Sequence, residues 1–281
     1  MTRHAIIKTH PAKYLLLVGL MLCVPFIIQA KEPTKKKGNG NEAAYNLNTE
    51  PDALPDKPAP ARHVRPHPIH QLTGRTLGAG HINTKYAEGI DVSHYQGNIN
   101  WDLLVRNAKI SYVYIKATEG AEIKDEFYAQ NVAGARRAGL SVGSYHFYRP
   151  QVPAQQQLQN MVSVVKASEQ DLVPIIDIEH AGRNEARFIA DLKAFIELVT
   201  QHYGKKPMLY TYQNFYNKHF VGLFPDYPWM IACYGGQPAV LNDGHNYLIW
   251  QYSSSSQMQG IPARVDRSRL MFNQSLERIR Y

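Results

Sequence analysis

Cysteine is almost absent from this 281-residue chain, which contains only Cys23 and Cys233. Because Cys23 lies in the N-terminal segment, removal of that segment would leave Cys233 alone. The sequence therefore excludes a disulfide framework and any metal site built on paired thiolates. A folded domain without disulfides depends on a large hydrophobic core, which a chain of this length with 44% hydrophobic residues can form.

An excess of charge is also absent from most of the chain, although the formal net charge is +8. Residues 1–30 contain three basic and no acidic residues, and residues 31–85 contain nine basic and five acidic ones. Residues 86–281 contain nineteen basic and eighteen acidic residues, so their net charge is only +1. A nucleic-acid enzyme concentrates positive charge on its folded surface, and we therefore expect no nucleic-acid partner.

The sequence has one long apolar run, from Tyr14 to Ile28, and three basic residues precede it. Ala30, a small residue at a possible cleavage point, follows it. This layout predicts a secretory signal peptide over residues 1–30. An uncleaved membrane anchor through residues 14–30 is the alternative, since a tilted run of this length approaches the thickness of a bilayer. Either interpretation places the protein outside the cytoplasm: periplasmic, in the cell envelope or secreted.

Residues 31–85 have almost no apolar periodicity and are rich in Lys, Pro, Asn and Gly. This composition predicts a disordered Lys/Pro-rich linker. Four histidines lie in or near it, but a Pro-rich, non-periodic segment does not fix ligand positions, so we expect no metal site from His63, His67, His70 and His81.

From residue 86 to 281 short apolar strands alternate with helical stretches. Such alternation is typical of βαβ units with parallel strands. Helical patterns become scarce after residue 220, and about 196 residues are fewer than a full barrel of this type uses. The expected fold class is α/β, a small incomplete β/α (TIM-like) barrel preceded by a disordered tail.

The most apolar strand, residues 173–179, ends in Asp177-Ile178-Glu179. Residues two apart in a strand share a face, so both carboxylates should point the same way while Ile176 and Ile178 pack behind them. Two carboxyls at the end of a buried strand repel each other and lose hydration, so one proton should be held tightly. Glycoside hydrolysis requires this arrangement, although structural salt bridges or caps explain an isolated Asp-x-Glu equally well.

Acidic, aromatic and amide side chains also follow other predicted strands. Asp91 ends the first strand and Asp266 lies near the last, and both could complete an acidic centre with Asp177 and Glu179. In a β/α barrel these strand ends meet at one mouth, where active sites lie. Single residues have simpler explanations, a helix cap for Asp91, a hydrogen-bonded core imidazole for His146 and core packing for Trp250. Taken together they indicate a sugar groove, with substrate contacts expected from Tyr145, His146, Tyr210, Tyr212, Tyr234, Trp250 and Gln251.

Five stretches resemble glycoside hydrolase family 25, the Chalaropsis-type lysozymes or N-acetylmuramidases. They are GIDVSHYQG at 89–97, YIKATEG at 114–120, GSYHF at 143–147, DIE at 177–179, and WQY at 250–252 followed by GI at 260–261 and VD at 265–266. Their order and spacing extend over about 190 residues, and the tail before Tyr86 lies outside the resemblance. The sequence differs from the common family pattern at Tyr95, where Trp is frequent, and at Arg267-Ser268.

The resemblance implies an incomplete β/α barrel that cleaves the β-1,4 bond between N-acetylmuramic acid and N-acetylglucosamine in peptidoglycan. It makes Glu179 the proton donor, with Asp91, Asp177 and Asp266 completing the acidic centre. The substrate's acetamido group could attack the anomeric carbon with Asp177 stabilising it, or Asp177 could be a direct nucleophile. No cofactor or metal is implied, and we expect a monomer.

Two alternatives belong to other functional classes. A non-catalytic cell-wall glycan-binding module could retain the barrel, but such a module would be expected to lose the acids, which are all present. A chitinase-like acetamido-sugar hydrolase of the substrate-assisted kind usually carries Asp-x-Asp-x-Glu, whereas position 175 here is Ile.

Overall fold

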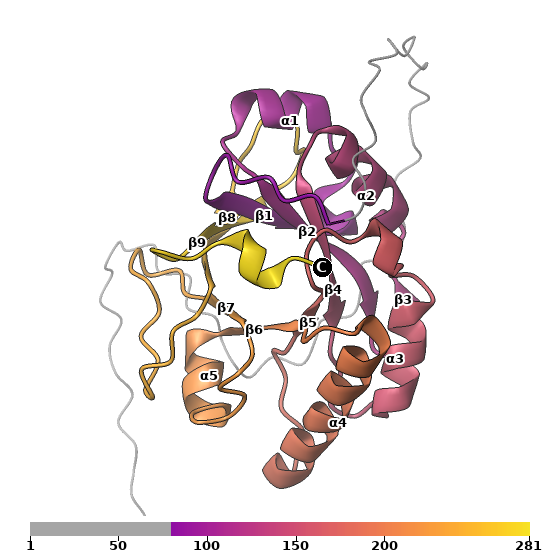
Figure 1. The fold of residues 1–281 in the computed structure, drawn as a ribbon, viewed down its shortest axis with the longest axis vertical. Coiled ribbons are helices and arrows are strands. Elements are labelled where there is room, and N and C mark those ends of the chain that lie inside the picture. The colour runs from indigo at the N-terminus through magenta and orange to yellow at the C-terminus, as the bar shows by residue number, and fades with distance from the viewer. Residues whose placement is uncertain (1–79) are drawn as a thin grey trace, which may run out of the picture. The chain divides into compact units, whose positions relative to one another are not determined.

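The computed structural model describes residues 80–281 (Figure 1). The predicted signal peptide or anchor and most of the predicted linker lie outside the described residues. No helix among residues 80–281 has the length and apolar character needed to cross a membrane.

Nine strands form one sheet, and eight of them close into a barrel. The barrel runs in the order β1, β2, β4, β5, β6, β7, β8, β9 and back to β1, while β3 (Ile123–Lys124) extends β2 at the rim. The bounds of the barrel strands are β1 (Glu88–Val92), β2 (Tyr112–Glu119), β4 (Ser141–Phe147), β5 (Ile175–Asp177), β6 (Met208–Tyr212), β7 (Trp229–Ala232), β8 (Ile249–Ser256) and β9 (Val265–Leu270). Neighbouring barrel strands are parallel except at β9, which is antiparallel to both β8 and β1, and the short β3 is antiparallel to β2.

Helices cover the outside of the barrel, as Figure 1 shows. They are α1 (Trp101–Asn107), α2 (Tyr128–Arg137), α3 (Ala154–Val162), α4 (Glu185–Tyr203) and α5 (Gln213–His219). Within the described residues no helix separates β7 from β8 or β8 from β9. The expected α/β class and incomplete β/α barrel are therefore confirmed.

The longest helix, α4, shows how the sequence defines such an element. The Asn184 side chain accepts a hydrogen bond from the Arg187 backbone N–H at its start, and Gly204, with φ +69°, ends it in the left-handed conformation. Apolar residues repeat every three or four positions between these signals. Their side chains form one buried stripe against the sheet: Phe188, Leu192, Phe195, Ile196 and Val199.

Two fully buried tyrosines from β2, Tyr112 and Tyr114, fill the inside of the barrel. Each ring lies over a glycine on a neighbouring strand, because a Cβ at Gly89 would be 2.2 Å from a Tyr112 ring carbon and one at Gly143 would be 2.2 Å from Tyr114. The two glycines thus provide the space for large side chains in a narrow barrel.

The C-terminal residues close the end of the barrel at which the parallel strands begin. Leu276 and Ile279 pack into the interior cluster, and the Val173 backbone N–H donates to the Ile279 carbonyl at 2.8 Å. Figure 1 shows the C-terminus at the centre of the ring of strands. This plug leaves the opposite end, where the parallel strands terminate, as the open mouth.

The chain joins the barrel earlier than the sequence predicted. The His81 backbone N–H donates to Asp171 at 3.1 Å, and the Asn83 backbone N–H and side-chain amide donate to Ser141 and to the Gly139 carbonyl. Gly80, His81 and Asn83 are therefore hydrogen-bonded to the barrel although they precede the linker boundary expected at residue 85.

Candidate active site

A cavity of about 210 Å³ opens at the carboxyl ends of the parallel strands. It brings together all four acids predicted from the sequence, which come from three strands, β1, β5 and β9. Its lining consists of Asp91, Tyr95, Lys116, Tyr145, Phe147, Ile175, Asp177, Glu179, Tyr210, Met230, Gln251 and Asp266. Apolar side chains, Phe147, Ile175 and Met230, lie among polar and charged ones in this lining, as in sites that orient a bound ligand.

Asp91 and Asp266 lie directly opposite each other on the antiparallel strands β1 and β9. Burial raises the pKa of Asp91 to about 8, and the neighbouring Asp266 charge adds to this rise. Burial also raises the pKa of Asp266, to about 6. At neutral pH this pair therefore retains about one proton, mainly on Asp91.

Asp177 is the last residue of β5, and Glu179 lies two residues further on, beyond the strand end. The strand is shorter than the predicted 173–179, but both acids line the cavity while Ile176 and Ile178 are buried in the outer core. Burial and the Glu179 charge raise the pKa of Asp177 well above its ordinary value. Burial and Asp266 raise the pKa of Glu179 as well, which the nearby Tyr210 hydroxyl partly opposes. Each of these two carboxyls therefore holds a proton more tightly than it would in water.

Gln251 connects the acids to two tyrosines. Its Oε1 accepts hydrogen bonds from the hydroxyls of Tyr210, at 2.9 Å, and Tyr234, at 2.7 Å. Its Nε2 donates to Asp91 at 3.1 Å and lies 3.5 Å from an oxygen of Asp266. Gln251 therefore fixes both the tyrosines and the Asp91–Asp266 pair from one position on β8.

The other predicted tyrosines also lie at the mouth. Tyr145 lines the cavity, and burial together with the charge of Asp177 raises the pKa of its hydroxyl well above the ordinary value. Tyr212 is at the end of β6, outside the cavity lining, where burial and the Glu179 charge raise its pKa. Tyr234 is half exposed beside Gln251.

Two predicted substrate contacts, His146 and Trp250, point away from the cavity. His146 is fully buried on the outer face of β4, between the Thr118 hydroxyl at 2.8 Å and the Gln157 side chain at 3.1 Å. Trp250 packs in the outer core and donates from Nε1 to the Cys233 carbonyl at 2.8 Å. Adjacent residues of a strand face opposite sides. Because Tyr145 and Gln251 face the cavity, their neighbours His146 and Trp250 face the outside of the barrel. The contact predictions for His146 and Trp250 were wrong.

Five lining residues were not predicted as site residues: Tyr95, Lys116, Phe147, Ile175 and Met230. Lys116 follows the alternation of Tyr112 and Tyr114 on β2, which was the available signal for an inward-facing side chain. Phe147 similarly follows Tyr145. Tyr95 is 69% exposed in a short turn after β1, a position that strand periodicity does not predict.

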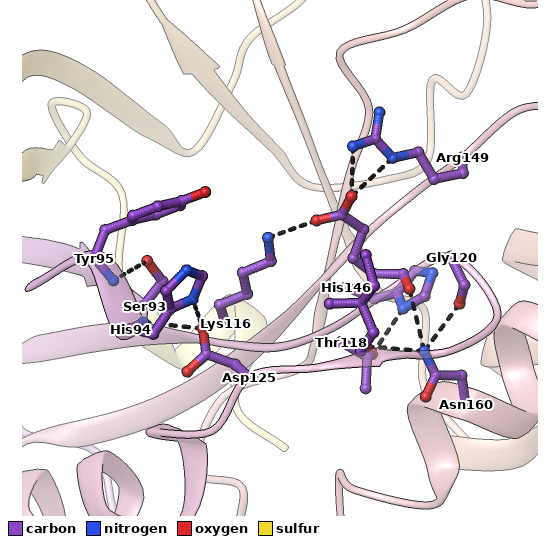
Figure 2. Close-up of polar contacts among 12 residues, drawn as sticks. Ser93, His94, Tyr95, Lys116, Thr118, Gly120, Asp125, His146, Arg149 and Asn160 are labelled. Atoms are coloured by element: carbon purple, nitrogen blue, oxygen red, sulfur yellow. Dashed lines mark hydrogen bonds and ion pairs between the residues drawn. The ribbon is translucent and has the colours of Figure 1, made fainter. Parts of the chain in front are cut away.

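The turn that carries Tyr95 is held by the pairing of His94 with Asp125 (Figure 2). The Asp125 carboxyl lies 2.7 Å from the His94 Nδ1 and accepts the His94 backbone N–H at 2.9 Å. The Ser93 hydroxyl accepts the Tyr95 backbone N–H, and the Gln96 side chain donates to the Arg264 carbonyl near β9. These contacts fix the exposed Tyr95 ring at the edge of the cavity. Among residues 80–281, no group of three or more His, Cys, Asp or Glu is arranged to hold a metal ion.

A barrel whose mouth gathers paired, proton-sharing carboxyls among tyrosines is the architecture of a glycoside hydrolase. The glycosyl hydrolases family 25 profile matches residues 90–261, and the chain belongs to this family.

Related proteins include a lysozyme and one without an assigned activity. Lysozyme M1 of Streptomyces globisporus is 30% identical over 253 residues, covering 81% of this chain and 85% of that protein. The uncharacterized protein YegX of Escherichia coli O157:H7 is 33% identical over 192 residues, covering 66% and 70%. The crystal structure of a bacterial lysozyme from Streptomyces coelicolor is 28% identical with a TM-score of 0.61, covering 70% of this chain and 96% of that one.

Proposed function

We propose that this protein is a muramidase, which hydrolyses the β-1,4 bond between N-acetylmuramic acid and N-acetylglucosamine in the glycan strands of peptidoglycan. The observation that carries the proposal is the convergence of Asp91, Asp177, Glu179 and Asp266 on one cavity of a family 25 barrel. The lysozyme from Streptomyces globisporus, which covers most of the chain, supports the same substrate.

Glu179 is the proton donor in this proposal. It is half-buried at the mouth, and its raised pKa favours the protonated form that a proton donor needs. Asp177 lies deeper, and its Oδ1 is buried without a hydrogen-bond partner among the described residues. An acetamido N–H of the bound sugar can donate to this oxygen, which stabilises the ionised form of Asp177 and leaves the proton on Glu179.

The reaction then proceeds in two steps with retention of configuration. Glu179 gives its proton to the leaving oxygen while the acetamido oxygen attacks the anomeric carbon, and the C–O glycosidic bond breaks. Glu179, now ionised, takes a proton from water, whose oxygen opens the cyclic intermediate. In the second candidate mechanism the Asp177 carboxylate itself bonds to the anomeric carbon. Trapping a glycosyl ester on Asp177 with a slow fluorosugar would support that second route and refute acetamido participation.

Asp91 and Asp266 hold the sugar and adjust the proton affinity of Glu179, since the Asp266 charge raises its pKa. Tyr145, Tyr210 and Gln251 provide hydrogen-bonding groups within the cavity. The partly buried Tyr212 and the half-exposed Tyr234 provide aromatic surface at its edge. Sugar rings present flat C–H faces that suit such surfaces.

The test offers insoluble peptidoglycan and chitin to the purified protein in parallel and identifies the new reducing-end sugar. The proposal predicts release of fragments ending in N-acetylmuramic acid and no comparable cleavage of chitin. Reducing-end N-acetylglucosamine, or faster cleavage of chitin, would refute muramidase activity. Binding to both polymers without any product would support a glycan-binding module instead.

We also propose that the protein is exported, acts in the periplasm, envelope or outside the cell, and is a monomer. The apolar run from Tyr14 to Ile28 after basic residues supports export. Mass spectrometry of the mature N-terminus, combined with cell fractionation, distinguishes cleavage after Ala30 from a retained anchor. A protein that starts at Met1 and remains in the cytoplasm would contradict the proposal, and light scattering gives the oligomeric state.

A further inference from the structure

Lys116 is the one basic residue among the described residues that line the cavity. Its ammonium group nevertheless forms its ion pair with Glu119, at 2.7 Å between Nζ and Oε2. The Lys116 and Glu119 side chains are both largely buried, with 11% and 12% of their surfaces exposed. The positive charge of the site is thus directed to a carboxylate outside the cavity lining.

Lys116 also acts electrostatically on the two acids proposed for catalysis. Lys116 on β2 is in register with Tyr145 on β4, which is in register with Ile175 on β5. These three residues therefore lie in one layer of the barrel, and Asp177 lies two residues beyond Ile175. The Lys116 charge lowers the pKa of both Asp177 and Glu179. Burial, together with the Glu179 charge at Asp177 and the Asp266 charge at Glu179, still keeps both pKa values raised. The Asp177 Oδ1 remains buried without a hydrogen-bond partner among the described residues.

Glu119 is held in turn by Arg149, which follows β4. The Arg149 Nε donates to Glu119 Oε1 at 2.9 Å, and its Nη2 donates to the same oxygen. The Arg149 guanidinium lies 4.6 Å from the centre of the Phe147 ring and Lys116 Nζ lies 5.5 Å from it. Figure 2 shows the ends of Lys116 and Arg149 directed at one carboxylate from two sides.

We propose that Glu119, fixed by Arg149, is a positioning residue that holds the Lys116 ammonium back from Asp177 and Glu179, so that both carboxyls stay open to the sugar. This inference rests on the proposed roles of Asp177 and Glu179. Without Glu119, a buried ammonium among carboxylates turns to the nearest remaining anion, since an unpaired buried charge is costly. The resulting ion pair at Asp177 occupies the oxygen that the acetamido group needs, and the nearby positive charge lowers the proton affinity of both carboxyls.

The simpler alternative is that Glu119 acts only through its negative charge. The charged and titratable groups that face Lys116 are Glu119 on its own strand, Tyr145 and Arg149 from β4 and its end, Asp177 and Glu179 from β5 and its end, and Asp91 and Asp266 across the cavity. Removal of the Glu119 charge lowers the pKa of Asp177 in either case. Only in our proposal does this change depend on the presence of Lys116.

The experiment is therefore a double-mutant cycle of Glu119→Gln and Lys116→Met, read as pH profiles of kcat and kcat/KM on soluble peptidoglycan fragments. Lys116 freed by Glu119→Gln lowers the pKa of the Asp177–Glu179 pair, so both limbs of the profile move to lower pH. We expect a shift of about one pH unit, at the low end for a new opposite charge, and a loss of roughly tenfold at the wild-type optimum. Adding Lys116→Met to Glu119→Gln should restore most of the wild-type pH profile and most of the lost activity.

The proposal is overturned if the double variant is as impaired as Glu119→Gln, or if Glu119→Gln causes the same shift in the Lys116→Met background. Arg149→Gln provides a second test, because it loosens Glu119 without removing its charge. We expect a smaller shift of the pH profile to lower pH, and Lys116→Met should again remove this shift. Glu277→Gln breaks a surface pair with Arg280 outside the cavity lining and is the matched control. Melting curves confirm that each variant is folded. Full activity of Glu179→Gln, measured in parallel, would refute the proposed function rather than this inference.

Discussion

The acidic pair at β1 and β9 should make the protein less stable at neutral pH than at mildly acidic pH, and Asp91→Asn should remove much of this effect. Asp91 has a pKa of about 8 in the folded protein and an ordinary value of 3.8. Because the folded state binds its proton more tightly, the stability from this group is full at low pH and is lost as pH rises from 3.8 to about 8. At pH 7 the loss extends over about three pH units, roughly 4 kcal/mol at 1.36 kcal/mol per unit.

Asparagine at position 91 has the shape of the protonated acid and carries no charge, so it avoids this cost. It accepts the Gln251 amide hydrogen bond less strongly than a carboxylate does, and we expect a net stabilisation of about 2–4 kcal/mol at pH 7. Denaturant unfolding at pH 5, 7 and 9 measures it, and the gain over wild type should increase with pH. An Asp91→Asn protein that is no more stable than wild type at pH 7, or whose advantage is the same at pH 5, would refute the reasoning.

Gly143→Ala should lower the free energy of unfolding by about 2–3 kcal/mol, because its Cβ would lie 2.2 Å from the buried Tyr114 ring. Gly235→Ala is the control, since its Cβ would meet no atom within 4 Å, and equal shifts in melting temperature for the two variants would contradict this packing. Trp250→Phe should lower the melting temperature while KM for soluble fragments stays within about twofold, because the ring packs outside the barrel; a large rise in KM would show that it contacts substrate. Gln251→Met should reduce kcat/KM by roughly 10- to 100-fold, because it leaves buried polar partners unsatisfied; an activity near that of wild type would show that Gln251 does not organise the site.

Much of the site could be predicted because strand ends of a parallel barrel meet at one mouth. Asp91, Asp177 and Glu179 follow apolar strands, and Asp266 was added by position and resemblance. The prediction failed where two adjacent residues of a strand were both assigned to the groove. His146 beside Tyr145, and Trp250 beside Gln251, cannot share a face with their neighbours. Only one residue of each pair could line the cavity, and the sequence prediction assigned both.

Other features were not predictable from local pattern. The strand β9 carries Asp266, Arg267 and Arg269 within six residues, and its apolar signal is too weak to identify a strand. The Lys116–Glu119 pair depends on a β-bulge between Lys116 and Thr118, which changes the alternation of β2. The placement of Arg149 beside Glu119 depends on a contact between residues 30 positions apart.

The most direct test of the account is the rate at which Glu179→Gln cleaves soluble peptidoglycan fragments, compared with wild type and with Asp191→Asn, which alters an exposed ion pair on α4. Glutamine keeps the size of the side chain but cannot give a proton to the leaving oxygen. We predict a loss of roughly 10²- to 10⁴-fold for Glu179→Gln with unchanged melting behaviour, and no loss for Asp191→Asn. A folded Glu179→Gln protein that cleaves these fragments at close to the wild-type rate would contradict the account.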